Sequence, residues 1–250
     1  PTPLDKDRKP DLTFIEAACR TIAENISRSV LVINESTSFP GTLRDYIKPL
    51  VEKYSENELE HLYAISPERV DPGRTDWNQK NTPRLVGSID DASQAKALAF
   101  YESICDAAVS VSTPEVAEAA KLLENTFRLV NIALINEFTQ LCATSGINVH
   151  EVIDAASSKP YGFMPFRPGV GVGGHCIPVD PLYLTWWARQ NGETAEFVES
   201  ADSINHQMPK YVAKRALSMV DSSIKTPKVL ILGVAYKPGV GDVRETPVTE

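Results

Sequence analysis

The feature that most constrains the fold is one long helical pattern, which spans residues 113–145. Thr113 can cap its N-terminus, Pro114 suits its first turn, and Gly146 follows its end. Apolar residues occupy one face at helical spacing and extend beyond it: Val116, Leu123, Phe127, Val130, Leu134, Phe138 and Leu141 on the face, with Leu122, Ile132 and Ile135 around it. A helix that is apolar almost all round is expected to be buried, here between domains or between subunits.

Before residue 113 the sequence alternates between helical and strand-like segments. Helical patterns cover residues 11–27, 41–54 and 90–104, and strand-like runs cover residues 29–36, 62–66, 84–88 and 107–112. Alternation with buried, β-branched strands predicts a parallel sheet covered by helices. We therefore expect this part to belong to a doubly wound α/β domain.

The segments after the long pattern are mostly helical. Helices are expected at about 148–157, within 181–192 and over 194–220, where Pro209 should kink or divide the last one. The run "KVLILGV" then has the composition of a buried strand, and we expect it to open a second α/β domain.

Charge and cysteine usage limit the class of protein. The 33 acidic and 25 basic residues give a net charge of -8, which disfavours a nucleic-acid partner. No run approaches the roughly 18 to 20 apolar residues of a membrane span, and no apolar signal segment opens the chain. We expect a soluble protein in a reduced, cytoplasmic setting, because its cysteines lack C-x-x-C spacing: Cys19, Cys105, Cys142 and Cys176.

The loop "GVGVGGHCIPVDP" combines glycines with a cysteine and an aspartate. Its G-x-G-x-x-G spacing does not indicate a dinucleotide-binding turn, because the proline-rich segment before it cannot form the required strand. Cys176 could be a nucleophile if a cation such as Lys121 lowered the thiol pKa, or an inert apolar residue in a tight turn. The glycines and Asp180 favour the nucleophile. The histidines show no paired ligand spacing, which argues against a metal site.

Lys121 and Asn125 are four residues apart and therefore share one face of the long helix. Polar groups in an apolar helix cost desolvation unless they have partners. A structural salt bridge from Lys121 to Glu118 or Glu124 would explain the lysine as well as a catalytic role would.

Polar residues also follow the expected strands. Thr37 and Glu68 each come just after a strand, at the edge where open α/β sheets bind ligands. Lys237 and Arg244 follow the "KVLILGV" run and could bind a phosphate group. Two charged residues in a solvated loop are an equally good explanation.

Six motifs in order resemble the nucleotide-sugar 6-dehydrogenase family of UDP-glucose, GDP-mannose and UDP-N-acetylhexosamine dehydrogenases. They are "PTPL", "ESTSFPGT", "SPERVDPG", "KLLENTFR", "PGVGVGGHCIPVDPLYL" and "LGVAYKPGVGDVRETP". Within the family the chain looks most like the UDP-N-acetylglucosamine branch, with the N-acetylmannosamine and N-acetylgalactosamine branches close to it. UDP-glucose enzymes usually carry a second glutamate where this chain has Pro72, and an arginine where it has Pro160.

The resemblance implies a domain plan and a fragment. Residues 1–112 would be the C-terminal half of the NAD-binding domain, 113–222 a central helical domain for dimerisation, and 223–250 the start of the UDP-sugar-binding domain. The Gly-rich cofactor turn on the first strand of such enzymes is not in this sequence.

The resemblance also implies a reaction, in which two NAD+ oxidise C6 of the sugar to a carboxylate. Cys176 would hold the aldehyde as a thiohemiacetal and then as a thioester. Thr37 would assist the first proton loss, and Lys121 and Asn125 would stabilise the oxyanions. Asp180 and Glu68 would orient or activate the hydrolytic water.

Binding roles follow from the same resemblance. Thr2, Thr37 and Arg244 are expected on the cofactor side, and the sugar nucleotide is expected to contact Arg167, Gly173, Gly174 and Lys237. The alternatives are a two-electron hydroxyacid dehydrogenase, which also carries a lysine and an asparagine four apart but needs no cysteine, and an inert fragment that only binds.

Overall fold

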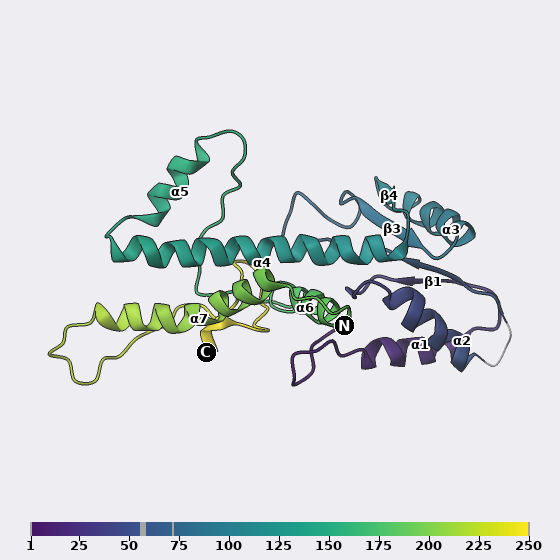
Figure 1. Ribbon diagram of the computed structural model, residues 1–250, viewed down its shortest axis with the longest axis horizontal. Coiled ribbons are helices and arrows are strands. Elements are labelled where there is room, and N and C mark those ends of the chain that lie inside the picture. The colour runs from purple at the N-terminus through teal and green to yellow at the C-terminus, as the bar shows by residue number, and fades with distance from the viewer. Residues whose placement is uncertain (1, 56–58, 72, 250) are drawn as a thin grey trace. The chain divides into compact units, whose positions relative to one another are not determined.

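The computed structural model describes residues 2–55, 59–71 and 73–249. It divides into two compact units, Pro1–Glu124 with Leu182–Glu193 and Asn125–Pro181 with Thr194–Glu250. The division falls inside helix α4 (Pro114–Thr144), which runs without interruption as expected (Figure 1).

The first unit contains a four-stranded sheet in the order β1 (Leu31–Asn34), β2 (Leu62–Ile65), β3 (Arg84–Ser88) and β4 (Ala108–Ser110). The parallel prediction is confirmed for β1 with β2 and for β3 with β4, and it is wrong for β2 with β3, which are antiparallel. A parallel pair needs a long crossover connection, usually a helix. The described residues between β2 and β3 form no helix.

Helices cover both faces of this sheet, as the doubly wound class requires. Val32, Tyr63 and Ile65 face α1 (Thr13–Asn25) and α2 (Lys48–Tyr54). Ala64 and Val86 face α3 (Asp91–Glu102) on the other side. The strand residues alternate between the two cores because successive side chains of a strand point to opposite faces.

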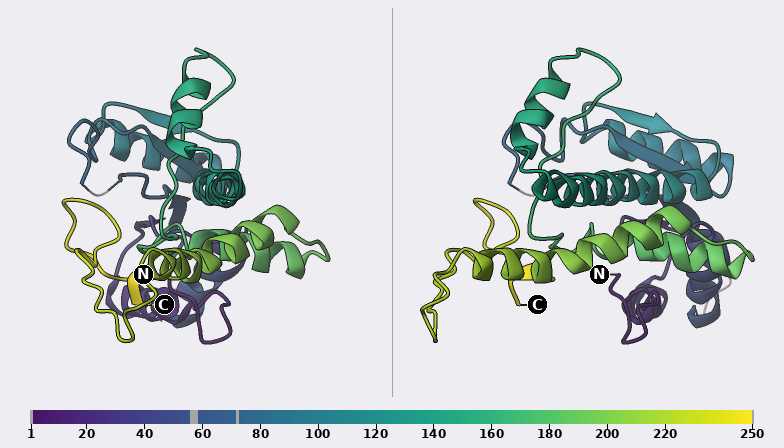
Figure 2. Two further views of the ribbon diagram at one scale, coloured as in Figure 1. Left: turned by 90° about the vertical axis from the view of Figure 1, so that its left-hand side faces the viewer. Right: turned by 60° about the vertical axis from the view of Figure 1, so that its left-hand side comes forward.

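The second unit contains the later part of α4, α5 (Val149–Ser157), α7 (Glu196–Ser218) and a short 3-10 turn at Pro247–Thr249. Helix α6 (Asp180–Gln190) begins in this unit and continues in the first. Pro209 lies inside α7, which continues past it, so the expected division of this helix is not found (Figure 2).

The run at residues 228–234 forms no strand, in contrast to the sequence prediction. Leu230 and Leu232 are 82% and 85% exposed. A strand is stabilised by hydrogen bonds to a neighbouring strand. The described residues of the second unit contain no other strand, so the run has no ladder to join.

Helix α4 is buried on one side only. Leu122, Leu129 and Ala133 are buried, whereas six members of the predicted apolar face are exposed. These six are Val116, Leu123, Phe127, Leu134, Phe138 and Leu141. We call them the apolar stripe of α4. Among the described residues, no helix is long and apolar enough to cross a membrane.

Candidate functional site

Cys176 lies at the start of the turn that leads into α6. Its carbonyl oxygen accepts hydrogen bonds from the amides of Val179 (3.2 Å) and Asp180 (2.8 Å). The residue is exposed, whereas Cys19 and Cys142 are buried and Cys105 is half-buried. Burial raises the pKa of the Cys19 thiol to about 11. Cys176 is therefore the cysteine that solvent or a substrate can reach.

Asp180 connects this turn to α4. Its carboxylate oxygen accepts a hydrogen bond of 2.5 Å from the side-chain amide of Asn125, and both residues are buried. As the first residue of α6, Asp180 also places its negative charge at the positive end of that helix. Three of the predicted site residues, Cys176, Asp180 and Asn125, thus belong to one hydrogen-bonded assembly within the second unit.

The glycines before Cys176 allow a close approach of an aromatic ring. A Cβ atom at Gly174, where φ is +84°, would lie 2.7 Å from the ring of Tyr236, and one at Gly173 would lie 2.7 Å from the Tyr236 Cβ atom. The amide of Gly174 donates to the carbonyl of Arg244 at 3.0 Å. Residues 173–174 are therefore held against the later segment that carries Tyr236 and Arg244, and only glycine fits at these positions.

Charged groups of that later segment lie near the thiol. Burial and the Arg244 cation lower the pKa of His175, which favours a neutral imidazole beside Cys176. The hydrogen bond from Arg244 to Asp242 raises the pKa of Arg244, and Cys176 is close enough to contribute to the same shift. Arg244 is therefore a cation near the thiol within the second unit.

Lys121 belongs to the first unit, and its side chain is only 8% exposed. The salt bridge considered for it is not found, because both carboxylates are engaged elsewhere. Glu118 accepts hydrogen bonds from backbone amides, and Glu124 forms an ion pair with Arg69 at 2.7 Å. The described part of the chain offers Lys121 no ion pair. A buried ammonium without a counter-charge is costly, which favours the functional interpretation of this lysine.

Thr37 and Glu68 lie where the sequence predicted, after β1 and β2 at the carboxyl edge of their parallel pair. Thr37 is half-buried. Partial burial opposes ionisation of Glu68, but the Val70 amide and the Arg84 guanidinium outweigh it and lower the pKa of this carboxyl. A carboxylate held in this way is a weak base, so the geometry does not suit the water-activating part of the role expected for Glu68.

Arg84 is the centre of this edge and was not among the predicted residues. It is 3% exposed and donates to Glu68 (2.7 Å), Glu35 (2.5 Å) and both the carbonyl (2.8 Å) and hydroxyl (3.1 Å) of Ser66. Its guanidinium carbon lies 5.0 Å from the centre of the Tyr101 ring, whose hydroxyl also donates to Glu35. Arg84 thus joins the segments that follow β1 and β2.

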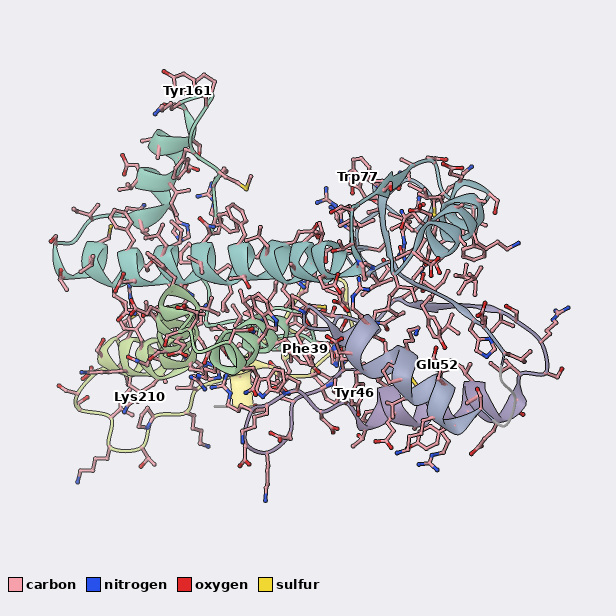
Figure 3. The ribbon with its side chains drawn as sticks, turned by 45° about the vertical axis from the view of Figure 1, so that its right-hand side comes forward. Phe39, Tyr46, Glu52, Trp77, Tyr161 and Lys210 are labelled. Carbon is pink, nitrogen blue, oxygen red and sulfur yellow. The ribbon has the colours of Figure 1, made fainter. Side chains whose placement is uncertain are left out.

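The remaining predicted residues are placed as follows. Thr2 is buried in the first unit, and Arg167 is exposed and pairs with Asp154 of α5. Lys237 is half-buried. Pro72, used in the comparison with UDP-glucose enzymes, lies outside the described residues, as does Pro1 of the first motif. Tyr161, near Pro160 in the loop after α5, is well exposed (Figure 3).

Comparison with known proteins gives the family. The NAD binding domain of the UDP-glucose/GDP-mannose dehydrogenase family matches residues 1–105, and the central domain of the same family matches residues 115–207. The chain belongs to this family.

Individual members of the UDP-glucose/GDP-mannose dehydrogenase family agree with this. UDP-N-acetyl-D-mannosamine dehydrogenase of Escherichia coli K12 is 34% identical over 100% of the chain and 62% of its own length. UDP-N-acetyl-D-glucosamine 6-dehydrogenase of Pseudomonas aeruginosa is 36% identical over 100% of the chain and 60% of its own length. The solved structure of UDP-D-ManNAc dehydrogenase from Pyrococcus horikoshii has a TM-score of 0.87 and 38% identity, covering 98% of the chain and 59% of that protein. The chain thus spans about 60% of the length of these relatives.

The part of the family's NAD binding domain present here offers a strand edge to a cofactor. The segment after β1 carries Ser36 and Thr37 at the carboxyl edge, which is where doubly wound sheets bind nucleotides. By contrast, the G-x-G-x-x-G spacing at residues 169–174 follows a loop and is packed by Tyr236. Of the residues expected on the cofactor side, Thr37 lies at the β1 edge, whereas Arg244 lies beside the glycine loop of Cys176 in the second unit.

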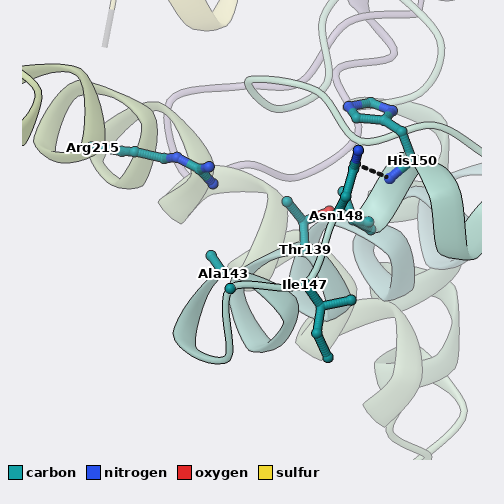
Figure 4. A pocket seen from close by; sticks show the side chains of 8 residues that line it. Thr139, Ala143, Ile147, Asn148, His150 and Arg215 are labelled. Atoms are coloured by element: carbon teal, nitrogen blue, oxygen red, sulfur yellow. Dashed lines mark hydrogen bonds between the residues drawn. The ribbon is translucent and has the colours of Figure 1, made fainter.

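A separate pocket of about 450 Å³ lies in the second unit, and its lining residues are distant from Cys176 in the sequence. It is lined by the end of α4, the start of α5 and Arg215 of α7 (Figure 4). Asn148 caps α5 there by accepting from the amide of His150 at 3.0 Å. None of the predicted site residues lines this pocket.

Three residues with notable contacts escaped sequence reasoning: Arg84 and Glu118 in the first unit, and Tyr236 in the second. Arg84 lay in an apolar strand run, where its charge was itself a signal, because an arginine in a buried strand needs carboxylate partners. Glu118 was considered only as a salt-bridge partner for Lys121. Tyr236 carried no signal, since its contact with Gly174 joins residues far apart in the sequence.

Proposed function

We propose that the protein carrying this chain is an NAD-dependent nucleotide-sugar 6-dehydrogenase that oxidises C6 of a UDP-N-acetylhexosamine to the carboxylate. The observation that supports this most strongly is the exposed Cys176 thiol on a turn whose Asp180 is hydrogen-bonded to the buried Asn125. The family's named members support the substrate class. Two molecules of NAD+, bound one after the other, would each accept one of the two hydrides of this four-electron oxidation.

The protein's own side chains would carry out the proton transfers and the covalent steps. In the first half, Thr37 would position the C6 hydroxyl or its water as the proton leaves, and the ammonium of Lys121 would stabilise the developing alkoxide. In the second half, the Cys176 sulfur would form a bond to the aldehyde carbon, and the resulting thiohemiacetal would lose the second hydride and its hydroxyl proton to give a thioester. Water would then cleave the carbon–sulfur bond and return the thiol.

Asp180 and Asn125 would serve this second half. The amide of Asn125 orients the Asp180 carboxylate, which would accept a proton from the attacking water or position that water. Because Asp180 also begins α6 on the Cys176 turn, the water and the thioester would be placed by one short segment.

The decisive experiment counts NADH per molecule of UDP-sugar. We expect two for the unmodified protein, and Cys176→Ala should lose at least about a hundredfold in carboxylate formation. Cys105→Ala is the matched control, because this half-buried thiol lies outside the site. One NADH per substrate with full activity in Cys176→Ala would instead establish the hydroxyacid dehydrogenase alternative.

The sugar epimer is a separate part of the proposal. The sequence favours UDP-N-acetylglucosamine, while the relatives include dehydrogenases named for the mannosamine and the glucosamine epimers. Measuring kcat/KM for both epimers in parallel decides this. A preference for the mannosamine epimer would correct the choice of sugar and leave the reaction class in place.

We also propose that the protein is a homodimer formed through the apolar stripe of α4. Exposed apolar residues recur along this helix at coiled-coil-like spacing, and large apolar patches on one helix face commonly mark an interface. Leu134→Glu, near the middle of the stripe, should give monomers in analytical ultracentrifugation. Arg128→Glu, at an exposed position of the same helix that is neither three nor four residues from any member of the stripe, is the control. A dimer that survives Leu134→Glu would reject this interface.

A further inference from the structure

Glu118 is a fully buried acidic side chain on α4 that none of the roles above uses. Its two oxygens accept hydrogen bonds from the backbone amides of Gly41 (2.7 Å) and Leu43 (3.0 Å). The hydroxyl of Ser38 lies 3.4 Å from one of them. All of these residues belong to the first unit. The oxygens of a buried carboxyl group need such donors in place of water.

The backbone that Glu118 holds is the segment carrying Thr37. This segment leaves β1 at Asn34, whose side chain accepts from the amide of Ser36 (3.1 Å) and donates to its carbonyl (3.1 Å). It ends at Gly41, where φ is +99°, just before the helical turn that begins at Thr42. Thr37 therefore lies between two anchors, the Asn34 side chain and the Glu118 carboxyl group.

Glu118 lies three residues before Lys121, and residues three apart on a helix are neighbours on its surface. The Glu118 side chain thus joins the Thr37 segment to the turn of α4 that carries Lys121. Phe39 of this segment also packs on Trp186 of α6, with ring centres 4.6 Å apart. If Glu118 served only to accept from the amides of Gly41 and Leu43, its position beside Lys121 would have no significance. The placement beside Lys121 ties two groups of the proposed site to one anchor.

We propose that Glu118 is a positioning residue, which fixes the Thr37 segment relative to Lys121 and so aligns the group that would move the proton with the group that would stabilise the alkoxide. This inference rests on the proposed function. Its structural part, the anchoring of residues 36–43, can be measured without turnover.

Hydrogen exchange of the protein without ligands measures the anchor. Glu118→Ala should increase exchange of the Gly41 and Leu43 amides at least about tenfold and leave β2 amides unchanged, because only the former lose their acceptor. Glu118→Gln keeps one carbonyl acceptor and should restore part of the protection. The control is Glu115→Ala, which removes a half-exposed ion pair between the same helix and Arg44 (2.7 Å).

A double-mutant cycle measures the positioning. Glu118→Ala should lower kcat at least about tenfold, and adding it to Thr37→Ala should lower kcat less than about twofold further, since the two changes disrupt the same alignment. Glu115→Ala should leave kcat unchanged alone and when combined with Thr37→Ala. Partial recovery of kcat in Glu118→Gln, at a thermal stability equal to that of Glu118→Ala, would separate alignment from folding.

The outcomes are distinct. Faster exchange with unchanged kcat and KM would show a purely structural anchor and overturn the inference, as would Glu118 and Thr37 effects that multiply. Absence of turnover in the unmodified protein would reject the proposed function. The same cycle is then run on NAD+ affinity by calorimetry, where independent effects of Glu118 and Thr37 would again overturn the inference.

Discussion

Replacing Arg84 by alanine should destabilise the first unit more than any change at its surface. The guanidinium is 3% exposed and makes four hydrogen bonds, two of them to carboxylates. Continuing the antiparallel register of β2 and β3 beyond the strand end brings residue 68 opposite residue 84. The ion pair with Glu68 is thus an extension of the sheet.

The magnitude follows from what each partner loses. Removing one member of a buried ion pair costs about 3 to 5 kcal/mol. Glu35 and Glu68 are 52% and 39% exposed at their side chains, so water can replace part of what Arg84 supplied. Ser66 is fully buried and would keep an unpaired carbonyl. We therefore expect a loss at the lower end, about 3 kcal/mol in the free energy of unfolding.

Tryptophan fluorescence in urea is the assay, because all three tryptophans lie in the first unit, in residues 1–124 and 182–193. The slope of the free energy against urea concentration should stay constant, which would show that the folded state alone has changed. Tyr101→Phe is the matched control. It removes one hydrogen bond to Glu35 (2.7 Å) and should cost about 1 kcal/mol. A loss below about 1 kcal/mol for Arg84→Ala would refute the account of this edge.

Further predictions concern the thiols, the glycine loop and the buried carboxyl. At pH 8 iodoacetamide should label Cys176 within minutes and leave Cys19 intact, since a thiol with a pKa of about 11 is only about 0.1% thiolate there; mass spectrometry of tryptic peptides reads the sites. Gly174→Ala should destabilise the second unit by about 1 to 3 kcal/mol, because the new methyl group meets an aromatic ring, whereas Gly146→Ala, with a similar positive φ but open space, should cost less in thermal melts. Burial raises the pKa of Glu118 to about 8, so between pH 4.5 and 8 the folded state holds a proton that the unfolded state has lost. Its contribution to stability is therefore complete below about pH 4.5 and disappears as the pH rises through 8, and in urea titrations Glu118→Gln should lack this decline.

Local patterns predicted the elements of the fold well. The span of α4 was predicted from its cap and its periodicity, and the structure places the helix at Pro114–Thr144. The strands at residues 62–66 and 84–88 were also located. Such elements depend on neighbours within a few residues, which a sequence displays directly.

The direction of pairing and the state of the 228–234 run could not be predicted in the same way. Whether β3 runs parallel or antiparallel to β2 depends on the connection between them and on the rest of the sheet. A strand-like composition predicts a strand only where another strand is present to pair with it. Both failures concern partners distant in the sequence, which periodicity does not specify.

The same distinction explains which site residues were found. Cys176, Asp180, Lys121 and Asn125 stood out because thiols, carboxylates and cations are unusual in glycine turns and apolar helices. Arg84 was missed because its effect depends on contacts with other strands.

Glu118 is the clearest example of a residue whose role depends on contacts distant in the sequence. Its sequence neighbours suggest a salt bridge with Lys121, whereas its actual partners are amides 75 and 77 residues away. If the carboxylate were paired with Lys121, the ammonium would be neutralised in the resting protein and less able to stabilise a new alkoxide. By accepting from backbone amides and keeping its proton up to about pH 8, Glu118 holds the neighbouring segment, and among the described residues the Lys121 charge stays uncompensated. A buried lysine can then respond to negative charge that appears only during the reaction, which is the arrangement that favours a transition state over a ground state.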